Sequence, residues 1–154
     1  MDKREKILER LVEVGASVVG DGKAFRNRVE IPESVRPAFV VLDADEFADE
    51  SDYGRKRPPM APRIVGMSPE IYILLGEKPE RIGPALSGVR ASLIKAILSD
   101  ASLVELCHDG DIRYGGFETG LAAGRSMEGE CRLNFTFQYL LRPDRLEASR
   151  MAVF

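Results

Sequence analysis

The sequence predicts an α+β fold: a two-layer sandwich in which a mixed, mostly antiparallel sheet of about four to five strands packs against two main helices. Two stretches, residues 3–19 and 79–98, carry apolar residues at helical spacing and predict the helices. A third stretch, residues 131–141, alternates apolar and polar side chains and predicts a long, half-buried antiparallel strand. The expected order of elements is helix, strand, strand, long loop, strand, helix, strand, strand.

Length and composition indicate one domain spanning residues 1–154. The chain has 44% hydrophobic and 31% charged residues, the balance of a globular protein large enough to fold without a disulfide or a metal. Its net charge is −3, from 22 Lys and Arg against 25 Asp and Glu, which argues against a general binder of nucleic acid or of anionic membranes. Two cysteines, Cys107 and Cys131, fit a reducing compartment and are too few for a disulfide framework or a zinc site. No apolar stretch reaches the ~18 residues of a membrane span, so we expect a cytoplasmic protein.

The first half of the chain predicts one helix and two strands. The helix over residues 3–19 turns an apolar stripe to the core and stops at a Gly-Asp-Gly sequence. A short strand is expected over residues 25–31, with Val29 and Ile31 on one face and a proline at its end. The apolar run of residues 38–42 predicts a strand that is covered on both faces.

Residues 43–62 show no periodic pattern and predict a long charged loop or arm. Three prolines near its end exclude a regular helix there. Its charges form an acidic block followed by a basic block. The acidic residues are Asp43, Asp45, Glu46, Asp49, Glu50 and Asp52, and the basic residues are Arg55, Lys56, Arg57 and Arg63. A structureless loop of this length in a compact domain is usually functional or disordered.

The second half predicts the remaining strands and the second helix. A long strand is expected over residues 63–76, with an edge, a bulge or a break near Pro69. The helix over residues 79–98 is expected to be regular from near Gly83, because Pro84 is best tolerated in a first turn. The other elements are a helical turn at 101–107, a short strand at 112–114, the long strand that Pro143 ends, and a tail over 144–154 that docks or frays.

No set of residues in the sequence predicts catalysis, a cofactor or a metal. His108 is the only histidine, and adjacent side chains usually point apart, so we expect no catalytic pair with Cys107. The acidic block carries enough oxygens for calcium or magnesium, but it lacks the glycine and glutamate of an EF-hand loop. Asp43 and Glu70 lack the lysine of a nuclease-like set, since Tyr72 stands in its place. The glycine-rich segment has neither the P-loop ending nor the strand–helix context of a dinucleotide site.

The order and spacing of short motifs along most of the chain carry a resemblance to a known family. The motifs are Arg26-Asn27-Arg28, Ile31-Pro32, Arg36-Pro37-Ala38, the segment from Pro62-Arg63-Ile64-Val65 to Pro69-Glu70-Ile71-Tyr72, Gly83-Pro84-Ala85-Leu86, Leu93-Ile94-Lys95-Ala96, the segment from Gly124-Arg125-Ser126 to Gly129-Glu130, and Leu141-Arg142-Pro143. With the amphipathic first helix and the acidic loop, they resemble the tail terminator (tail completion) proteins of long-tailed, siphovirus-like phages, prophages and gene transfer agents. The fold that the resemblance implies, a mixed sheet flanked by helices, agrees with the elements predicted above.

The resemblance implies a virion structural protein and no enzymatic residues. Such proteins form a hexameric ring at the head-proximal end of the tail tube. The ring stops tube growth and offers a joining surface to the head or neck. The expected partners are therefore further copies of the chain, the tail tube protein and a head–tail connector or neck protein, with DNA only passing through the lumen and no membrane. The protein would be made in the bacterial host cytoplasm and found in the virion.

A ring needs two different, complementary patches on each subunit, because its contacts are head-to-tail. The charge blocks of residues 43–63 are candidates for such patches; alternatively, they pair within one loop or stay solvated. The candidate interface residues are Asp45, Glu46, Asp49, Glu50, Asp52, Arg55, Lys56, Arg57, Arg125, Glu128 and Glu130. Exposed ion pairs contribute only about 0–1 kcal/mol each, so apolar contacts or an added strand would have to supply the remaining affinity. The acidic balance also predicts a neutral or acidic lumen.

Two other functions stay open at this point. A head–tail connector or neck adaptor of similar size would differ in its partner. A small cytosolic α+β enzyme or ligand-binding domain would show a compact apolar pocket with convergent polar groups.

Overall fold

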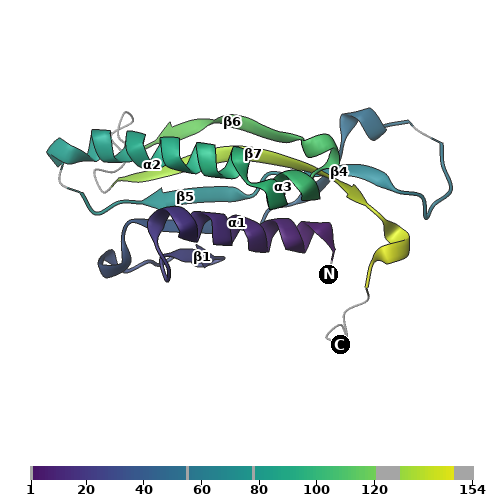
Figure 1. Ribbon diagram of the computed structural model, residues 1–154. Coiled ribbons are helices and arrows are strands. Elements are labelled where there is room, and N and C mark those ends of the chain that lie inside the picture. Colours follow the sequence, from purple (N-terminus) through teal and green to yellow (C-terminus); the bar gives the residue numbers. More distant parts are fainter. Residues whose placement is uncertain (1, 55, 78, 121–128, 148–154) are drawn as a thin grey trace.

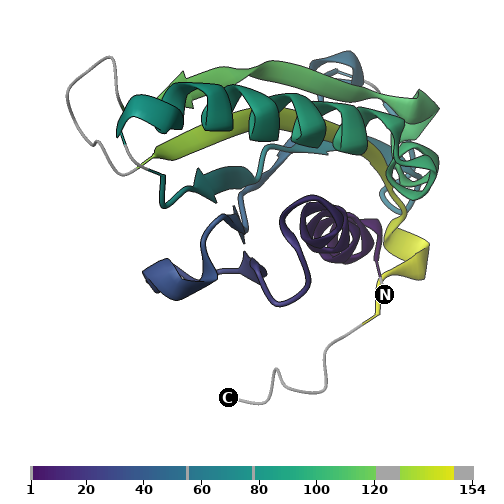
Figure 2. The ribbon, with the colours of Figure 1, turned by 60° about the vertical axis from the view of Figure 1, so that its left-hand side comes forward.

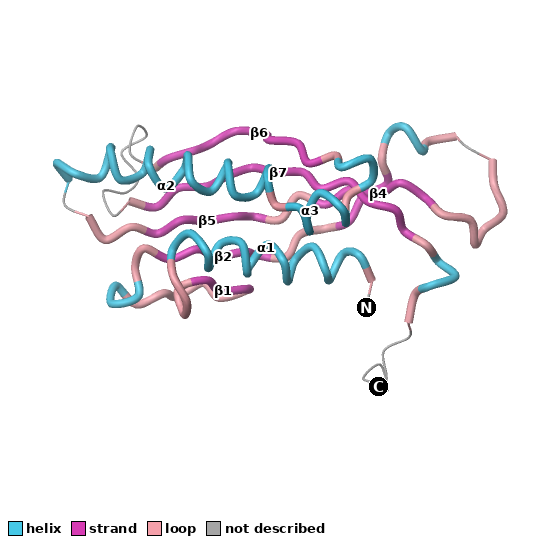
Figure 3. Tube along the Cα trace, viewed as in Figure 1, coloured by secondary structure: helices cyan, strands magenta, loops and turns pink. Residues whose placement is uncertain are grey.

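The computed structural model describes residues 2–54, 56–77, 79–120 and 129–147 of the chain. Over these described residues, the protein has a two-layer α+β fold, with three α-helices packed on a mixed seven-stranded sheet (Figures 1 and 3). This confirms the predicted fold class, with more strands than expected. The helices are α1 (Lys3–Val19), α2 (Pro79–Ser99) and α3 (Ala101–Leu106). The strands are β1 (Ala24–Arg26), β2 (Ala38–Leu42), β3 (Glu46–Ala48), β4 (Arg63–Met67), β5 (Glu70–Leu74), β6 (Ile112–Thr119) and β7 (Glu130–Leu141).

Helix α1 forms where the sequence predicts it, because its ends and its apolar stripe are encoded locally. The side chain of Asp2 accepts a hydrogen bond from the backbone N–H of Glu5 and caps the first turn. Gly20 ends the helix with a φ of 113°, a conformation that favours glycine. Ile7 and Leu11 are fully buried and belong to the core between the helices and the sheet.

Strand β7 is the centre of the sheet and pairs along both of its edges. Strand β6 is antiparallel to one edge, while β4 and β5 lie end to end along the other. Their register against β7 is continuous, so β4 and β5 are one extended segment interrupted only at Ser68 and Pro69. The predicted strand over residues 63–76 is therefore present up to Leu74, with the break that its proline indicates. Beyond this row, β3 pairs with β4, β2 pairs with β5, and β1 pairs parallel to β2.

The helices lie on one face of the sheet, with α1 over β1 and β2 and with α2 over β6 and β7 (Figures 1 and 2). The main core fills the space between these layers and includes the fully buried Phe39, Met67 and Phe137. A smaller apolar cluster, which contains Ala38 and Val40, lies on the opposite face of β2. Strand β2 is thus covered on both faces, as its unbroken apolar run predicts.

The prediction for residues 25–31 is wrong beyond Arg26. Asn27 adopts a positive φ of 54°, which ends the extended conformation of β1. Val29 is 83% exposed, while Ile31 is buried in the smaller cluster, so the two side chains do not share a strand face.

Two element boundaries also differ from the predictions. Helix α2 is helical from its first residue, Pro79, rather than from near Gly83, and Pro84 lies inside it. Strand β6 continues well past Tyr114, because a register shift between Tyr114 and Gly116 makes a bulge without ending the pairing with β7.

Candidate functional site

The segment predicted as a patternless loop over residues 43–62 is largely an ordered arm at one end of the sheet. Strand β3 pairs antiparallel with β4 and continues the ladder that β2 makes with β5. Between the two pairings, residues 43–45 face residues 68–69, a one-residue excess that is typical of a bulge. We call residues 46–67 the arm and residues 49–62 its tip. The tip extends beyond the helices, at the right in Figure 1.

A polar contact ties the base of the arm to the core, and an apolar contact joins its two strands, β3 and β4. The Tyr139 hydroxyl, on a side chain that is 1% exposed, donates a hydrogen bond of 2.5 Å to Glu46 Oε1. Burial, together with this bond, raises the pKa of Tyr139 above its usual value. The Phe47 ring covers Gly66, where a Cβ atom would lie only 2.7 Å from the ring. The glycine thus makes room for an aromatic side chain across the ladder.

The tip is held together by its own charges. Arg57 forms an ion pair of 2.8 Å with Asp52, and the two side chains are only 16% and 9% exposed. Arg57 also donates a hydrogen bond to the carbonyl of Pro62 at 3.0 Å. The Asp49 carboxylate accepts a hydrogen bond from the Ser51 hydroxyl and another, at 3.0 Å, from the Ser51 backbone N–H, which caps a short 3-10 turn. These two bonds lower the pKa of Asp49. The acidic and basic blocks therefore pair, in part, within one loop.

Other side chains of the arm, and Asp45 just before it, are exposed to solvent. The charged ones are Asp45, Glu50 and Lys56, and two large apolar side chains are also exposed, Tyr53 at 64% and Met60 at 58%. Tyr53 and Met60 are candidate contact residues that the charge pattern does not indicate. The sequence contains a signal for their exposure, because an aromatic residue and a methionine inside a charged, proline-rich loop have no local core in which to be buried.

The structure separates the predicted interface residues into two groups. Seven of them lie on the arm or at its base: Asp45, Glu46, Asp49, Glu50, Asp52, Lys56 and Arg57. Glu130 lies at the opposite end of the sheet, where it opens β7 and pairs with Leu74. Arg55, Arg125 and Glu128 lie outside the described residues, as do residues 148–154 of the predicted tail.

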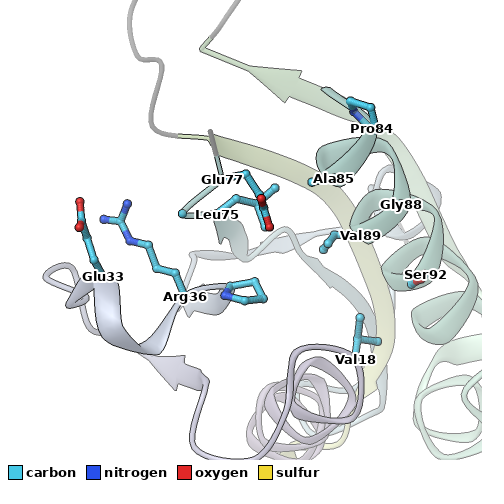
Figure 4. Close-up of a pocket in the computed structure, with 12 residues that line it drawn as sticks. Val18, Glu33, Arg36, Leu75, Glu77, Pro84, Ala85, Gly88, Val89 and Ser92 are labelled. Carbon is cyan, nitrogen blue, oxygen red and sulfur yellow. The ribbon is translucent and has the colours of Figure 1, made fainter. Parts of the chain in front are cut away.

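A groove of about 410 Å³ lies at the end of the sheet opposite to the arm (Figure 4). One wall is the part of α2 that presents Ala85, Gly88 and Ser92. The other walls come from the end of α1, from residues 33–37 and from residues 75–77. Charged side chains also line it: Glu33, Arg36 and Glu77. The groove therefore combines a small-residue wall with a charged rim.

The structure also shows the surroundings of Cys107 and Asp43, the residues considered for a catalytic pair and for a nuclease-like set. Burial raises the pKa of the Cys107 thiol to about 12, so the thiol is protonated at neutral pH. His108 Nε2 lies 3.4 Å from a carboxylate oxygen of its neighbour Asp109. Asp43 accepts hydrogen bonds from Arg26, which lowers the pKa of its carboxyl group.

Within residues 2–54, 56–77, 79–120 and 129–147, no group of three His, Cys, Asp or Glu side chains is placed to hold a metal ion. Across the same ranges, no helix has the length and apolar character to span a membrane.

No protein-family model matches the chain, and no curated protein matches it in sequence. Among solved structures, the fold is similar to that of a sheath/tube terminator of PVC, an extracellular contractile injection system, determined by cryo-EM in the extended state. The similarity covers 99% of this chain and 62% of that protein, with 9% sequence identity and a TM-score of 0.48. A similarity this distant concerns the arrangement of the elements, and we draw no function from it.

Proposed function

We propose that this chain is a tail terminator subunit. Copies of it would form a hexameric ring at the head-proximal end of a phage-type tail tube, stop the addition of tube subunits and join the tail to the head or neck. Its partners would be other copies, the tail tube protein and a connector or neck protein, with DNA passing through the lumen. The order and spacing of the motifs in the sequence support this family, and the α+β fold agrees with it.

One structural observation supports a ring subunit in particular: the molecule carries two unlike surfaces at opposite ends of one sheet. The arm projects at one end, and the groove opens at the other (Figures 1 and 4). A head-to-tail contact joins two different patches and closes into a ring when the rotation between neighbours allows it. We place the predicted interface residues of the arm in this contact.

Electron microscopy of particles assembled without the gene tests the proposal. Overlong tails of variable length, unattached to heads, are the expected result, because nothing would end tube growth. Tails of normal length that fail to join heads would instead make the protein a connector or neck adaptor. Unchanged, complete particles would overturn both assembly functions and favour a ligand-binding domain or enzyme.

A further inference from the structure

We propose that the tip of the arm inserts into the groove of a second copy of this chain, and that this contact joins neighbours head-to-tail. The inference rests on the proposed function, and it adds the two surfaces that meet. It also assigns contact residues that the charge pattern does not show: Tyr53 and Met60 on the tip, and Gly88 and Ser92 in the groove.

The tip has the properties of an inserted element. Its backbone is braced internally, since the Asp52–Arg57 pair and the Asp49 cap hold its turns. A braced tip loses little conformational freedom on binding. It exposes Tyr53 and Met60 on this frame, and aromatic residues and methionine are enriched at the centre of protein interfaces.

The groove has the properties of a receiving site. It is a partly open groove with a volume of about 410 Å³, which is within the size range of ligand pockets. The small side chains on α2 leave free space along this wall of the groove. A Cβ added at Gly88 would meet no atom within 4 Å. Arg36, which lines the groove, is half-buried. Its guanidinium group carries several N–H donors, and a carbonyl or carboxylate of an inserted tip would provide an acceptor.

Both surfaces carry charges of both signs, so pairs of opposite charge can form between them. Glu33, Glu77 and Arg36 line the groove, and the tip exposes Glu50 and Lys56. Lys56 is a partner for the glutamates of the groove, and Glu50 is an acceptor for the Arg36 guanidinium. Such pairs fix orientation and exclude wrong partners more than they add affinity. The apolar tip side chains would supply the larger share of the affinity.

The tip cannot reach the groove of its own molecule. The groove lies beside Leu75, next to the start of β7, and the tip lies beyond the other end of that strand. Strand β7 has 12 residues, which at the usual rise separate its ends by about 40 Å. The occupant of the groove is therefore a neighbour, and repeating the contact gives every subunit one neighbour on each side.

Single-cysteine substitutions test this contact by disulfide cross-linking. Tyr53→Cys places a thiol on the tip, and Ser92→Cys places one in the groove, while the native Cys107 and Cys131 are buried. The two purified variants are mixed and oxidised. Insertion predicts a heterodimer of the two variants and little homodimer of either. The matched control pairs Tyr53→Cys with Ser102→Cys, an exposed serine on α3 outside the groove, and should cross-link about tenfold more slowly because docking concentrates only the first pair of thiols.

Equal rates in the two mixtures, with Tyr53→Cys and also with Met60→Cys on the tip, would overturn the contact, because each of these variants keeps the other apolar side chain. So would homodimers of Tyr53→Cys in place of heterodimers, which would indicate a two-fold contact between tips. Met60→Cys, also exposed on the tip, repeats the test at a second position and guards against a variant that fails to fold. The outcome is separable from that of the gene deletion. Overlong tails without specific cross-links would support the terminator function and contradict this contact. Specific cross-links with unchanged particles would support the contact and contradict the terminator function.

Discussion

At the residue scale, arginine–carboxylate pairs tie α1 to the rest of the molecule. Arg10 donates hydrogen bonds of 2.9 and 2.6 Å to the two carboxylate oxygens of Asp100, which joins α1 to the start of α3. Arg26 donates to both Glu5 and Asp43, which joins α1 to β1 and to the end of β2. Each arginine lowers the pKa of its carboxyl partners, because the ionised carboxylate accepts the hydrogen bonds.

These pairs predict that acid destabilises the protein. The folded-state pKa values of Asp100, Asp43 and Glu5 lie below the unfolded ones. Their stabilisation is therefore complete above an unfolded pKa of about 4 and is lost as the pH falls through the lower folded values. Asp100→Asn keeps an oxygen that can cap α3 but removes the charge. We expect it to lower the free energy of unfolding at pH 7 by about 1 kcal/mol, because Arg10 is partly exposed and its pair is screened.

Urea unfolding at pH 7 and in acid measures this effect. The difference between wild type and Asp100→Asn should shrink as the pH falls, since the wild-type carboxyl group then also becomes neutral. Asp21→Asn, at an exposed turn, is the control and should leave the stability unchanged. A difference that persists undiminished in acid would mean that the substitution acts through packing or through the cap rather than through charge.

Two helical glycines, Gly15 in α1 and Gly88 in α2, should respond to alanine in opposite directions. A methyl group at Gly15 would overlap the buried ring of Phe39, so overpacking should lower the free energy of unfolding by about 1–3 kcal/mol. A methyl group at Gly88 meets nothing within 4 Å, and the higher helix propensity of alanine should raise the same quantity by about 0.5–1 kcal/mol. Urea unfolding of both variants checks the pair. Equal effects at the two sites would contradict the tight packing of α1 on β2.

At the element scale, periodicity predicts the long elements well, whereas it predicts the bounds of β1 poorly and gives no sign of β3. Helix α1 and strand β7 are long enough for their apolar patterns to be read, and both form where predicted. Strands β1 and β3 have three residues each and therefore no readable period. They are strands because β2 and β4 offer them backbone partners, which is a property of the tertiary structure.

The candidate site was predictable to a similar extent. The charge pattern located the arm, because separated blocks of charge are visible along the chain. It could not show that Asp52 and Arg57 pair inside the tip, since that depends on the turns between them. The groove left no signal in the sequence, because its walls come from four separate segments that only the folded chain brings together. The break at Pro69, by contrast, follows from one residue that cannot donate a ladder hydrogen bond.

Replacing residues 50–61 of the tip by a short Gly-Ser linker should separate folding from assembly. The core clusters contain no residue of the tip, and the Asp52–Arg57 pair is internal to it. We therefore expect the free energy of unfolding to change by less than about 1 kcal/mol, while ring formation is lost. Circular dichroism with urea unfolding and negative-stain microscopy give the two readouts. Deleting Glu46–Lys56 instead would also remove β3 and the Glu46–Tyr139 bond. A loss of rings could then result from a loss of stability as well as from a loss of the contact. Normal rings from the linker variant would show that the tip is not part of the contact.

At the scale of the whole molecule, the net charge constrains how the proposed ring can interact with DNA. Each subunit adds −3, so a ring of identical subunits is acidic as a whole. Non-specific DNA binding requires lysines and arginines to replace the counterions of the phosphates, and its affinity falls steeply with salt. A tail must let DNA pass, and a bore lined by basic residues would retain it.

We therefore predict that assembled rings show no salt-dependent binding of duplex DNA. Fluorescence anisotropy of a labelled duplex, measured from about 50 to 200 mM salt, provides the test, because phosphate contacts weaken affinity by orders of magnitude over this range. The unassembled linker variant, which has no bore, is the control. Binding that appears only in the ring and weakens with salt would place basic side chains in the lumen and contradict the prediction. Binding shared by ring and control would come from an outer surface, such as the exposed Lys56 or Arg113, and would leave a neutral or acidic bore intact.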